Sequence, residues 1–471
     1  MPYLPLEQKP YTNIESVGNK AAFESFIDCD KSDLMQNTFR EGLGGDTNDY
    51  FTDLGTSAQI DGIFEVINQD FAAVFSDGKL FKVESDGTAT EITGVTINAD
   101  TPVSYADFGV TGYFCNNSRI LKWNYADATC SYIVDGDAPT DATFVGFIDQ
   151  YLLALRADSA RFEHSDVGLP DTWLGEFNTE ETRPDNAVGL FCNFGQIFIP
   201  GTNTLATWID SGDADSPFER IPGSAEERGS LSPYSFTQID NSYFFLDTER
   251  RVIRLAGNQP QVISNDFDDR FQSLTDVTDA IGYHYTAEGN TKYVLHFPTD
   301  EKTYTFDYKR NLWSEWSHFN NTTATRDNYL GRMGAYIVKW NKYIIGSRVD
   351  GKLYIASNDY VTDEGDNIIA EFVTGRYNHG TSRYKTPTKM VIEYKRGAIS
   401  ASDSYEPQIS ISWRDNGSSV WKSEKNIVIN MIGDPYSYKT LKRLGKYRDR
   451  QYRVKMQGND TTIISMEEII E

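Results

Sequence analysis

The sequence predicts an all-β protein: a six- to seven-bladed β-propeller followed by a C-terminal antiparallel β-sandwich. Short apolar and aromatic runs recur about forty to fifty residues apart, which is the spacing of four-stranded blades. Phe, Trp and Tyr make up 13% of the chain, and large rings pack well on half-buried strands. Helical periodicity is nearly absent, and only residues 265–274 have the pattern of a short helix.

The repeated pattern divides the chain into three parts. Residues 1–58 are polar and are expected to form an N-terminal arm that closes onto the rest. Residues 59–360 hold the expected propeller, and residues 361–471, with longer alternating runs, hold the expected sandwich. The β-type runs of the propeller start near Ile60, Ser104, Phe144, Val188, Ser235, Ile281 and Gly334.

Several of the repeated units contain the pattern of a hairpin. In residues 74–81, an apolar run meets the polar turn Asp77-Gly78 and continues as a basic-aliphatic run. Residues 113–121, 245–253 and 346–354 have the same organisation. Each is expected to be a hairpin inside a blade, because Asp, Asn and Gly tolerate the backbone of tight turns.

Charge is distributed unevenly along the chain. The net charge is −25, but residues 1–300 hold 18 Lys and Arg against 48 Asp and Glu. Residues 301–471 hold 26 Lys and Arg against 21 Asp and Glu. An acidic surface repels a phosphate backbone. Two readings stay open: an ordinary solvated surface, or a channel wall along which DNA slides without sticking.

Two segments near the C-terminus organise the last part of the chain. In residues 408–421, apolar side chains alternate with polar ones up to Trp413, and Asp415-Asn416-Gly417 then favours a turn. Residues 441–455 begin as a basic run interrupted by Gly445 and end in an alternating stretch. This pattern predicts a hairpin and a loop that leads into a further strand.

These two segments together resemble the C-terminal part of the packaged-DNA stabilisation proteins, or tail nozzle proteins, of short-tailed bacteriophages. Residues 162–173, 304–316, 350–354 and 359–363 fit the same family in the same order. The resemblance implies a structural virion protein of the phage tail, made in the host bacterial cytoplasm. It implies a closed ring, a hexamer in this family, that lies below the portal and its adaptor and extends the DNA channel.

The same resemblance implies what the ring does and what it contacts. It would help to retain packaged DNA and let it pass during ejection. The expected partners are further copies of the chain, the portal-adaptor protein, and tail needle, plug or fibre proteins. DNA would pass through the lumen without sequence-specific binding.

A basic run provides the candidate subunit or partner contacts. Two aromatic residues, Tyr447 and Tyr452, are interleaved with it, and Asp449 lies within it. Three uses stay open: salt bridges within or between subunits, contact with the acidic surface of a partner protein, and contact with DNA. The candidate residues are Lys442, Arg443, Lys446, Arg448, Arg450 and Arg453.

No pattern in the sequence indicates an enzyme. Residues 412–421 differ in spacing from the Asp-box of propeller enzymes, and no P-loop or catalytic Gly-x-Ser-x-Gly is present. Carboxylates such as Asp266, Asp268 and Asp269, or Glu226 and Glu227, are read as turns or solvated faces. We therefore expect no catalytic residue.

The alternative function is a propeller-type tail depolymerase or another glycan-binding protein. Trp173, Trp208, Trp313 and Trp316 could stack on sugars, or they could simply pack between blades.

Cysteines, histidines and hydropathy give three further expectations. Cys29, Cys115, Cys130 and Cys192 are widely spaced and are expected to be reduced packing residues. The five histidines form no His-x-x-x-His pair, so neither a metal site nor a cofactor is expected. No long uncharged apolar run is present, so no membrane insertion is expected.

Overall fold

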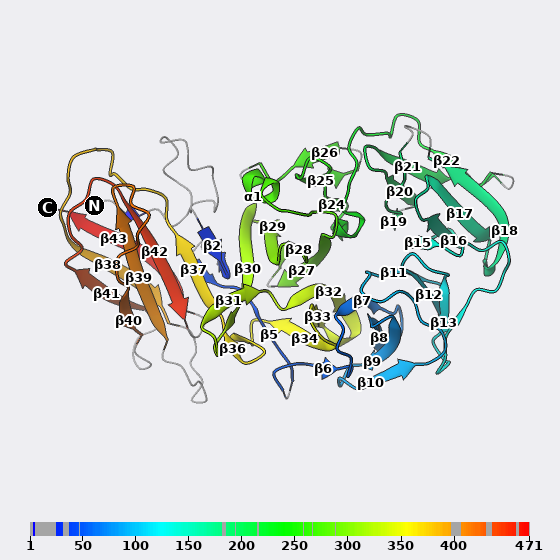
Figure 1. Ribbon diagram of the computed structural model, residues 1–471, viewed down its shortest axis with the longest axis horizontal. Coiled ribbons are helices and arrows are strands. Elements are labelled where there is room, and N and C mark those ends of the chain that lie inside the picture. The colour runs from blue at the N-terminus through cyan, green and yellow to red at the C-terminus, as the bar shows by residue number, and fades with distance from the viewer. Residues whose placement is uncertain are drawn as a thin grey trace.

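Figure 1 shows the computed structural model, in which a β-propeller carries a region of two packed sheets at one end. The structure describes residues 3–4, 25–31, 37–46, 48–180, 185–193, 195–213, 216–257, 259–265, 267–287, 289–396, 407–429, 436–457 and 461–470.

Seven antiparallel blades surround one axis in the described part of the chain. The first blade contains β7 (Ile60–Glu65), β8 (Phe71–Ser76), β9 (Lys79–Glu84) and β10 (Ala89–Ile92). The second contains β11 (Ser104–Asp107), β12 (Thr111–Cys115), β13 (Leu121–Asn124) and β14 (Ser131–Tyr132). The third contains β15 (Ala142–Ile148), β16 (Tyr151–Arg156), β17 (Arg161–Asp166) and β18 (Leu169–Thr179). The fourth contains β19 (Phe191–Asn193), β20 (Gln196–Pro200), β21 (Leu205–Asp210) and β22 (Phe218–Arg220).

The last three blades follow the same order. The fifth contains β23 (Thr237–Ile239), β24 (Ser242–Leu246), β25 (Val252–Ala256) and β26 (Gln259–Val262), preceded by the 3-10 turn η1 (Pro233–Ser235). The sixth contains β27 (Ile281–Ala287), β28 (Asn290–Phe297), β29 (Lys302–Asp307) and β30 (Leu312–Asn320), with β31 (Thr325–Asn328) paired to β30. The seventh contains β32 (Gly331–Ile337), η2 (Val338–Trp340), β33 (Lys342–Ser347) and β34 (Lys352–Ser357). The short helix α1 (Asp268–Gln272) lies between the fifth and sixth blades, within the predicted residues 265–274.

The predicted propeller is confirmed, and the local sequence explains its hairpins. β7, β11 and β27 begin at the predicted Ile60, Ser104 and Ile281. Between β8 and β9, Asp77 and Gly78 have φ angles of 55° and 69°. Two successive positive φ angles make the turn whose twist matches the flanking strands, and Asp-Gly adopts it with little strain.

The N-terminal residues complete the seventh blade. β5 (Gly42–Gly44) and β6 (Thr52–Asp53) both pair antiparallel with β34, so strands from the two ends of the propeller sequence lie in one sheet. A Cβ on Gly42 would lie 2.5 Å from the carbonyl oxygens of Tyr360 and Thr362. Glycine therefore allows β5 to approach this neighbouring backbone. Within the described part of residues 1–58, β5 and β6 thus lie against the propeller.

Residues after the propeller form two packed antiparallel sheets, called here the two-sheet region. One sheet contains β37 (Ile369–Val373), β42 (Arg450–Gln457), β39 (Gln408–Asp415) and β40 (Lys425–Val428). The other contains β38 (Pro387–Lys395), β43 (Thr462–Ile470) and β41 (Tyr436–Lys442), together with β4 (Asn37–Phe39), β3 (Cys29–Lys31) and β1 (Tyr3–Leu4). Two two-residue strands, β35 (Thr362–Asp363) and β36 (Asp366–Asn367), connect this region to the seventh blade.

The core of the two-sheet region continues into the propeller. Ile411 and Val454 from one sheet and Ile392 and Met466 from the other are fully buried in one cluster, which also contains Trp313 of the sixth blade. β2 (Ser25–Ile27) joins the two parts, because it pairs with both β30 and β37. Each buried aliphatic side chain contributes about 1.5–3 kcal/mol, more than an exposed ion pair does. Apolar packing therefore holds the two parts together.

A buried polar network reinforces the same junction. Arg40 Nε donates to Asp28 Oδ1 at 2.8 Å, and Arg40 Nη1 donates to Asp363 Oδ1 at 3.0 Å. Arg326 Nη1 donates to Asp28 Oδ2 at 2.7 Å, and Arg40 Nη2 donates to the Ser317 carbonyl oxygen at 2.7 Å. The network thus links the N-terminal segment, the sixth blade and the segment after the seventh blade.

Candidate interaction surface

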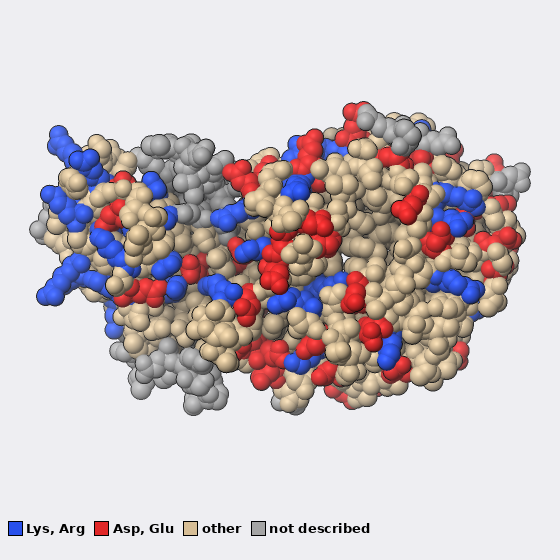
Figure 2. All heavy atoms as spheres, viewed as in Figure 1, with Lys and Arg blue, Asp and Glu red and all other residues tan. Residues whose placement is uncertain are grey.

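Lysine and arginine side chains gather at the end of the molecule formed by the two-sheet region, while acidic side chains spread over the propeller (Figure 2). The connection between β41 and β42 supplies part of this basic surface. Its Arg443 has a φ of 62°, and Gly445 has a φ of 77°, so the chain turns sharply here. This turn separates exposed cationic side chains from the apolar Leu444, which is buried.

Four of the predicted contact residues form an exposed cationic group, called here the basic surface: Lys442, Arg443, Lys446 and Arg448. Within the described residues, none of the four has a carboxylate within ion-pair distance. Of the three uses left open for this run, salt bridges within the subunit are thus not formed by these four side chains among the described residues. Their positive charge remains available to a partner.

Tyr384 provides a platform beneath part of the basic surface. The Arg448 guanidinium carbon lies 4.6 Å from the centre of the Tyr384 ring, and Lys446 Nζ lies 5.0 Å from it. The Tyr384 side chain is itself 53% exposed. Cations over an aromatic face gain about 0.5–1 kcal/mol at exposed sites, which restricts two otherwise flexible side chains.

Arg450 was predicted as a contact residue, and the structure corrects this. Its guanidinium is fully buried, with Nε 2.6 Å from Asp415 Oδ1 and Nη1 3.4 Å from Glu468 Oε1. Nη2 donates to the Leu444 carbonyl oxygen at 2.7 Å, and the guanidinium carbon lies 4.0 Å from the Tyr447 ring centre. Arg450 therefore stabilises the interior of the two-sheet region and is not accessible to a partner.

The charges around Arg450 are mutually compensated. Burial alone would lower the pKa of Arg450, but the hydrogen bond with Asp415 and the further polar contacts raise it. Burial alone would raise the pKa of Glu468, but hydrogen bonds from His379, Tyr447 and Tyr452 outweigh this and lower it. Both groups therefore stay charged in the core, as buried ions do when they are paired and hydrogen-bonded.

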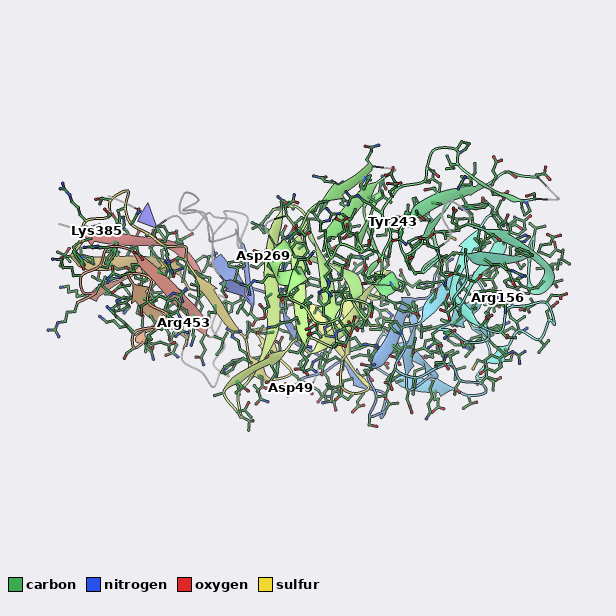
Figure 3. All side chains as sticks on the ribbon, turned by 45° about the horizontal axis from the view of Figure 1, so that its top comes forward. Asp49, Arg156, Tyr243, Asp269, Lys385 and Arg453 are labelled. Atoms are coloured by element: carbon green, nitrogen blue, oxygen red, sulfur yellow. The ribbon has the colours of Figure 1, made fainter. Side chains whose placement is uncertain are left out.

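Arg453 is half-buried and occupied by its own chain. Its Nη2 lies 3.4 Å from Glu424 Oε1, and Nε donates to Ser412 Oγ at 3.2 Å. The guanidinium carbon also lies 4.8 Å from the centre of the Trp421 ring. Figure 3 shows Arg453 and Lys385 on the two-sheet region, away from Arg156 and Tyr243 of the propeller.

Sequence reasoning missed the strand that borders the basic surface. β41 is an edge strand, and its Tyr436 and Tyr438 side chains are 56% and 63% exposed. The Tyr-Ser-Tyr-Lys-Thr-Leu-Lys alternation of residues 436–442 is a strand signal that could have been recognised. Tyr384, in contrast, lies far away in sequence from the basic run, so no local pattern connects it to Arg448.

The tryptophans proposed for sugar stacking are buried. Trp173, Trp208, Trp313 and Trp316 are 2%, 8%, 4% and 4% exposed. The Trp313 ring stacks 5.2 Å from the Phe267 ring with an interplanar angle of 9°. All four side chains therefore pack inside or between blades, and this part of the alternative function is wrong.

The acidic candidates were expected to lie in turns or on solvated faces. Asp268 accepts a hydrogen bond from Ser264 Oγ at 2.6 Å, and burial raises its pKa. Asp269 lies in the first turn of α1, and Asp266 is outside the described residues. The backbone N–H and carbonyl groups of Glu226 form hydrogen bonds with the backbone of Leu205. Asp268 and Asp269 therefore lie in a short helix and Glu226 in an isolated bridge with Leu205, not in the expected turns.

No metal-binding group of three or more His, Cys, Asp or Glu occurs in the described part of the chain. None of the four cysteines forms a disulfide, and three of them are buried. Among the described residues, no helix has the length and apolar character to cross a membrane.

The centre of the propeller is a cavity of about 540 Å³ whose wall comes from the inner strands of the blades. Aromatic rings fill much of its surroundings: Phe144 and Tyr234 stack at 5.2 Å, and Phe191 and Phe236 stack at 4.6 Å. Asp61 in its wall forms a buried ion pair with Arg332. A cavity of this volume has the size of a small-molecule pocket and not of a passage for duplex DNA.

A family model described as bacteriophage P22 Gp10, beta-propeller, matches residues 58–361, more than half of the chain. No curated protein matches the sequence. Several solved structures are similar at low identity. BamB from Moraxella catarrhalis is 10% identical with a TM-score of 0.38, over 71% of this chain and 97% of BamB. Virginiamycin B lyase from Staphylococcus aureus is 10% identical with a TM-score of 0.44, over 64% and 96% of the two chains. YCF48 from Cyanidioschyzon merolae is 11% identical with a TM-score of 0.42, over 68% of this chain and 100% of YCF48.

Proposed function

Because the chain belongs to the phage stabilisation family of bacteriophage P22 Gp10 and so has a structural role in a phage particle, we propose that it forms the nozzle ring of a short phage tail. Several copies, six by resemblance, would close into a ring below the portal and its adaptor. The ring would extend the DNA channel, help to retain the packaged DNA and pass it during ejection.

The central propeller cavity is too small for duplex DNA, which supports a DNA channel enclosed by several subunits and not one within a single propeller. The cavity holds only about 540 Å³, and its surroundings are filled by stacked rings. DNA would therefore travel through a lumen that several copies enclose together. A closed ring of identical subunits needs two different complementary surfaces on each copy.

The separation of charge is the observation that carries the proposal furthest. Residues 1–300 have 48 acidic against 18 basic side chains, and the unpaired cations of the basic surface lie at the other end of the molecule. The basic surface would contact the acidic propeller of a neighbour or an acidic face of the adaptor. Acidic propeller faces turned to the lumen would repel the DNA backbone and keep it moving.

The buried junction between propeller and two-sheet region suits a part that carries mechanical load. The two parts share a continuous apolar core and the Arg40 network, and the N-terminal strands β5 and β6 complete the seventh blade. A subunit joined in this way would transmit force from packaged DNA as one body. Needle, plug or fibre proteins would then bind to a rigid ring.

Assembly is the property to measure. Electron microscopy and native mass spectrometry of the full chain, alone and with its adaptor protein, should give a closed ring with an axial channel. Arg448→Glu should weaken ring formation or adaptor binding by about tenfold or more, because like charges would then face each other. Lys395→Glu makes the same charge change at an exposed side chain of β38 and should leave assembly unchanged.

Two results would contradict the proposal. A chain that stays monomeric, both alone and with the adaptor, would exclude the ring. Equal effects of Arg448→Glu and Lys395→Glu would show that the basic surface is not the contact, even if a ring forms. Raising the salt concentration should weaken the wild-type contact and have less effect on Arg448→Glu.

A further inference from the structure

A second cavity, called here the blade 6/7 pocket, lies where the ends of β27, β33 and β34 meet, and these strands can be located in Figure 1. Its volume is about 770 Å³, within the ~300–1,000 Å³ of small-molecule sites. Asp46, from the loop between β5 and β6, forms part of its wall. The N-terminal segment that completes the seventh blade therefore also closes this pocket.

Aromatic rings form much of the pocket wall. Tyr336 and Tyr360 are only partly buried, and Trp340 belongs to the short η2 turn. The rings of Tyr336 and Tyr343 lie 5.1 Å apart with an interplanar angle of 36°, so they present one continuous surface. Such a surface suits the C–H face of a pyranose ring, which is apolar and flat enough to pack on an aromatic face.

Polar groups without partners occur next to these rings. Within the described residues, the ring nitrogens of His284 make no hydrogen bond, and burial lowers its pKa. A neutral imidazole offers one donor and one acceptor. Asn341 Oδ1 accepts a hydrogen bond from the Tyr336 hydroxyl at 2.6 Å, which leaves the Asn341 amide hydrogens free in the described part of the chain.

Trp340 adds a third unpaired group to this wall. Its side chain is 9% exposed, and its Nε1 has no hydrogen-bond acceptor among the described residues. This nitrogen is fully buried, so a molecule bound in the open pocket would reach it only if the Trp340 side chain moved. A ligand rich in hydroxyl groups would satisfy donors and acceptors together.

The charges of the pocket restrict the class of ligand. Lys342 Nζ lies 2.6 Å from Asp46 Oδ2, so this ion pair compensates the cation in the wall. Asp359 is the other charged lining residue, and no cation in the wall is paired with it. The pocket therefore has no positive charge to spare for a phosphate, sulfate or uronic acid group.

We propose that the blade 6/7 pocket binds a neutral saccharide, with the sugar ring packed on Tyr336 and its hydroxyl groups hydrogen-bonded to His284 and Asn341. This site is distinct from the four buried tryptophans and from the basic surface. It requires no ring assembly, because all the residues that form it belong to one chain. The nozzle proposal and the saccharide proposal can therefore fail independently.

Saturation-transfer NMR on the full chain tests the site with four probes. Glucose-, galactose- and mannose-based tetrasaccharides represent neutral saccharides, and tetragalacturonate represents an anionic one. At least one neutral tetrasaccharide should bind, and tetragalacturonate should bind more weakly. Tyr336→Ala and His284→Ala should each weaken the binding by about tenfold or more, since each removes part of the sugar contact.

Tyr438→Ala is the matched control, because Tyr438 is an exposed tyrosine of β41 in the two-sheet region. It should bind the same tetrasaccharide as the wild type does. Asp359→Ala, at an exposed position, gives a third pocket variant that is expected to fold normally. Failure of every neutral probe to bind, stronger binding of tetragalacturonate, or unchanged binding by all pocket variants would each overturn the proposal.

Discussion

Replacement of Arg40 by methionine should loosen the junction between the propeller and the two-sheet region. Arg40 and its partners Asp28 and Asp363 have side chains that are each 1% exposed. The guanidinium also lies 4.9 Å from the centre of the Tyr329 ring, which a methionine side chain could still contact. The substitution therefore preserves much of the packing but leaves two buried carboxylates without their main cation.

The expected loss of stability is large because the carboxylates of Asp28 and Asp363 would remain buried without Arg40. Removing one partner of a buried ion pair costs about 3–5 kcal/mol. Asp28 would keep Arg326 and the Ser317 backbone amide, at 2.7 Å and 2.8 Å, so the lower end of this range applies to its side of the network. Among the described residues, Asp363 would keep only the neighbouring His318 as a cationic group, 3.9 Å away, and only when that histidine is protonated.

Native-state hydrogen exchange can localise this loss. A cost of about 3 kcal/mol corresponds to an increase of roughly a hundredfold in the exchange of amides that open with the junction. β5 follows Arg40 directly and pairs with β34, so its amides should report the change. Lys82→Met, which breaks an exposed pair with Glu84, is the control and should change exchange by less than about fivefold. A similar small change in Arg40→Met would refute the reasoning.

Three further predictions concern single positions. Burial alone would lower the pKa of His318, but Asp363 and Asp366 raise it. The ion pairs of protonated His318 should therefore stabilise the protein fully below about pH 6.5, and this stabilisation should be lost as the pH rises through the raised pKa. The difference in melting temperature between wild type and His318→Asn should therefore shrink from pH 5.5 to 8.5, and a constant difference would argue against this pair. Gly42→Ala should lower the melting temperature by several degrees because of the backbone contacts at 2.5 Å, whereas Gly136→Ala, with no atom within 4 Å, should not. Tyr452→Phe removes the 2.6 Å hydrogen bond to Glu468 and should cost about 1–3 kcal/mol in urea unfolding; a cost near zero would mean that Glu468 is satisfied without it.

The repeated part of the fold could be predicted from the sequence because each blade is local. Adjacent strands of a blade are joined by short turns, so a hairpin such as β8–β9 is specified within about fourteen residues. The number of blades could not be predicted, because the seventh takes its outer strands from residues 42–53. Such pairing depends on contacts about three hundred residues apart, which leave no local periodic signal.

The candidate surface could be predicted only as a segment. The sequence predicts the basic run as a contact site, and four of its six candidate residues are exposed. Residues 443–449 form an irregular connection, so no period-two pattern separates inward from outward side chains there. Arg450 is buried because its partners Asp415 and Glu468 come from other strands, and neither is close to it in sequence.

Structural and exposed cations of this chain differ in whether a carboxylate pairs with them, more than in whether they are lysine or arginine. Arg40 and Arg450 lie in the interior, and each contacts two carboxylates of its own chain. Arg448 and Lys446 lie on the surface and have an aromatic neighbour but no carboxylate among the described residues. A paired interior cation has no charge left for a partner, whereas an unpaired surface cation gains energy when an acidic surface approaches it. In the ring that we propose, these unpaired cations would therefore contact the acidic side chains of a neighbouring copy rather than DNA.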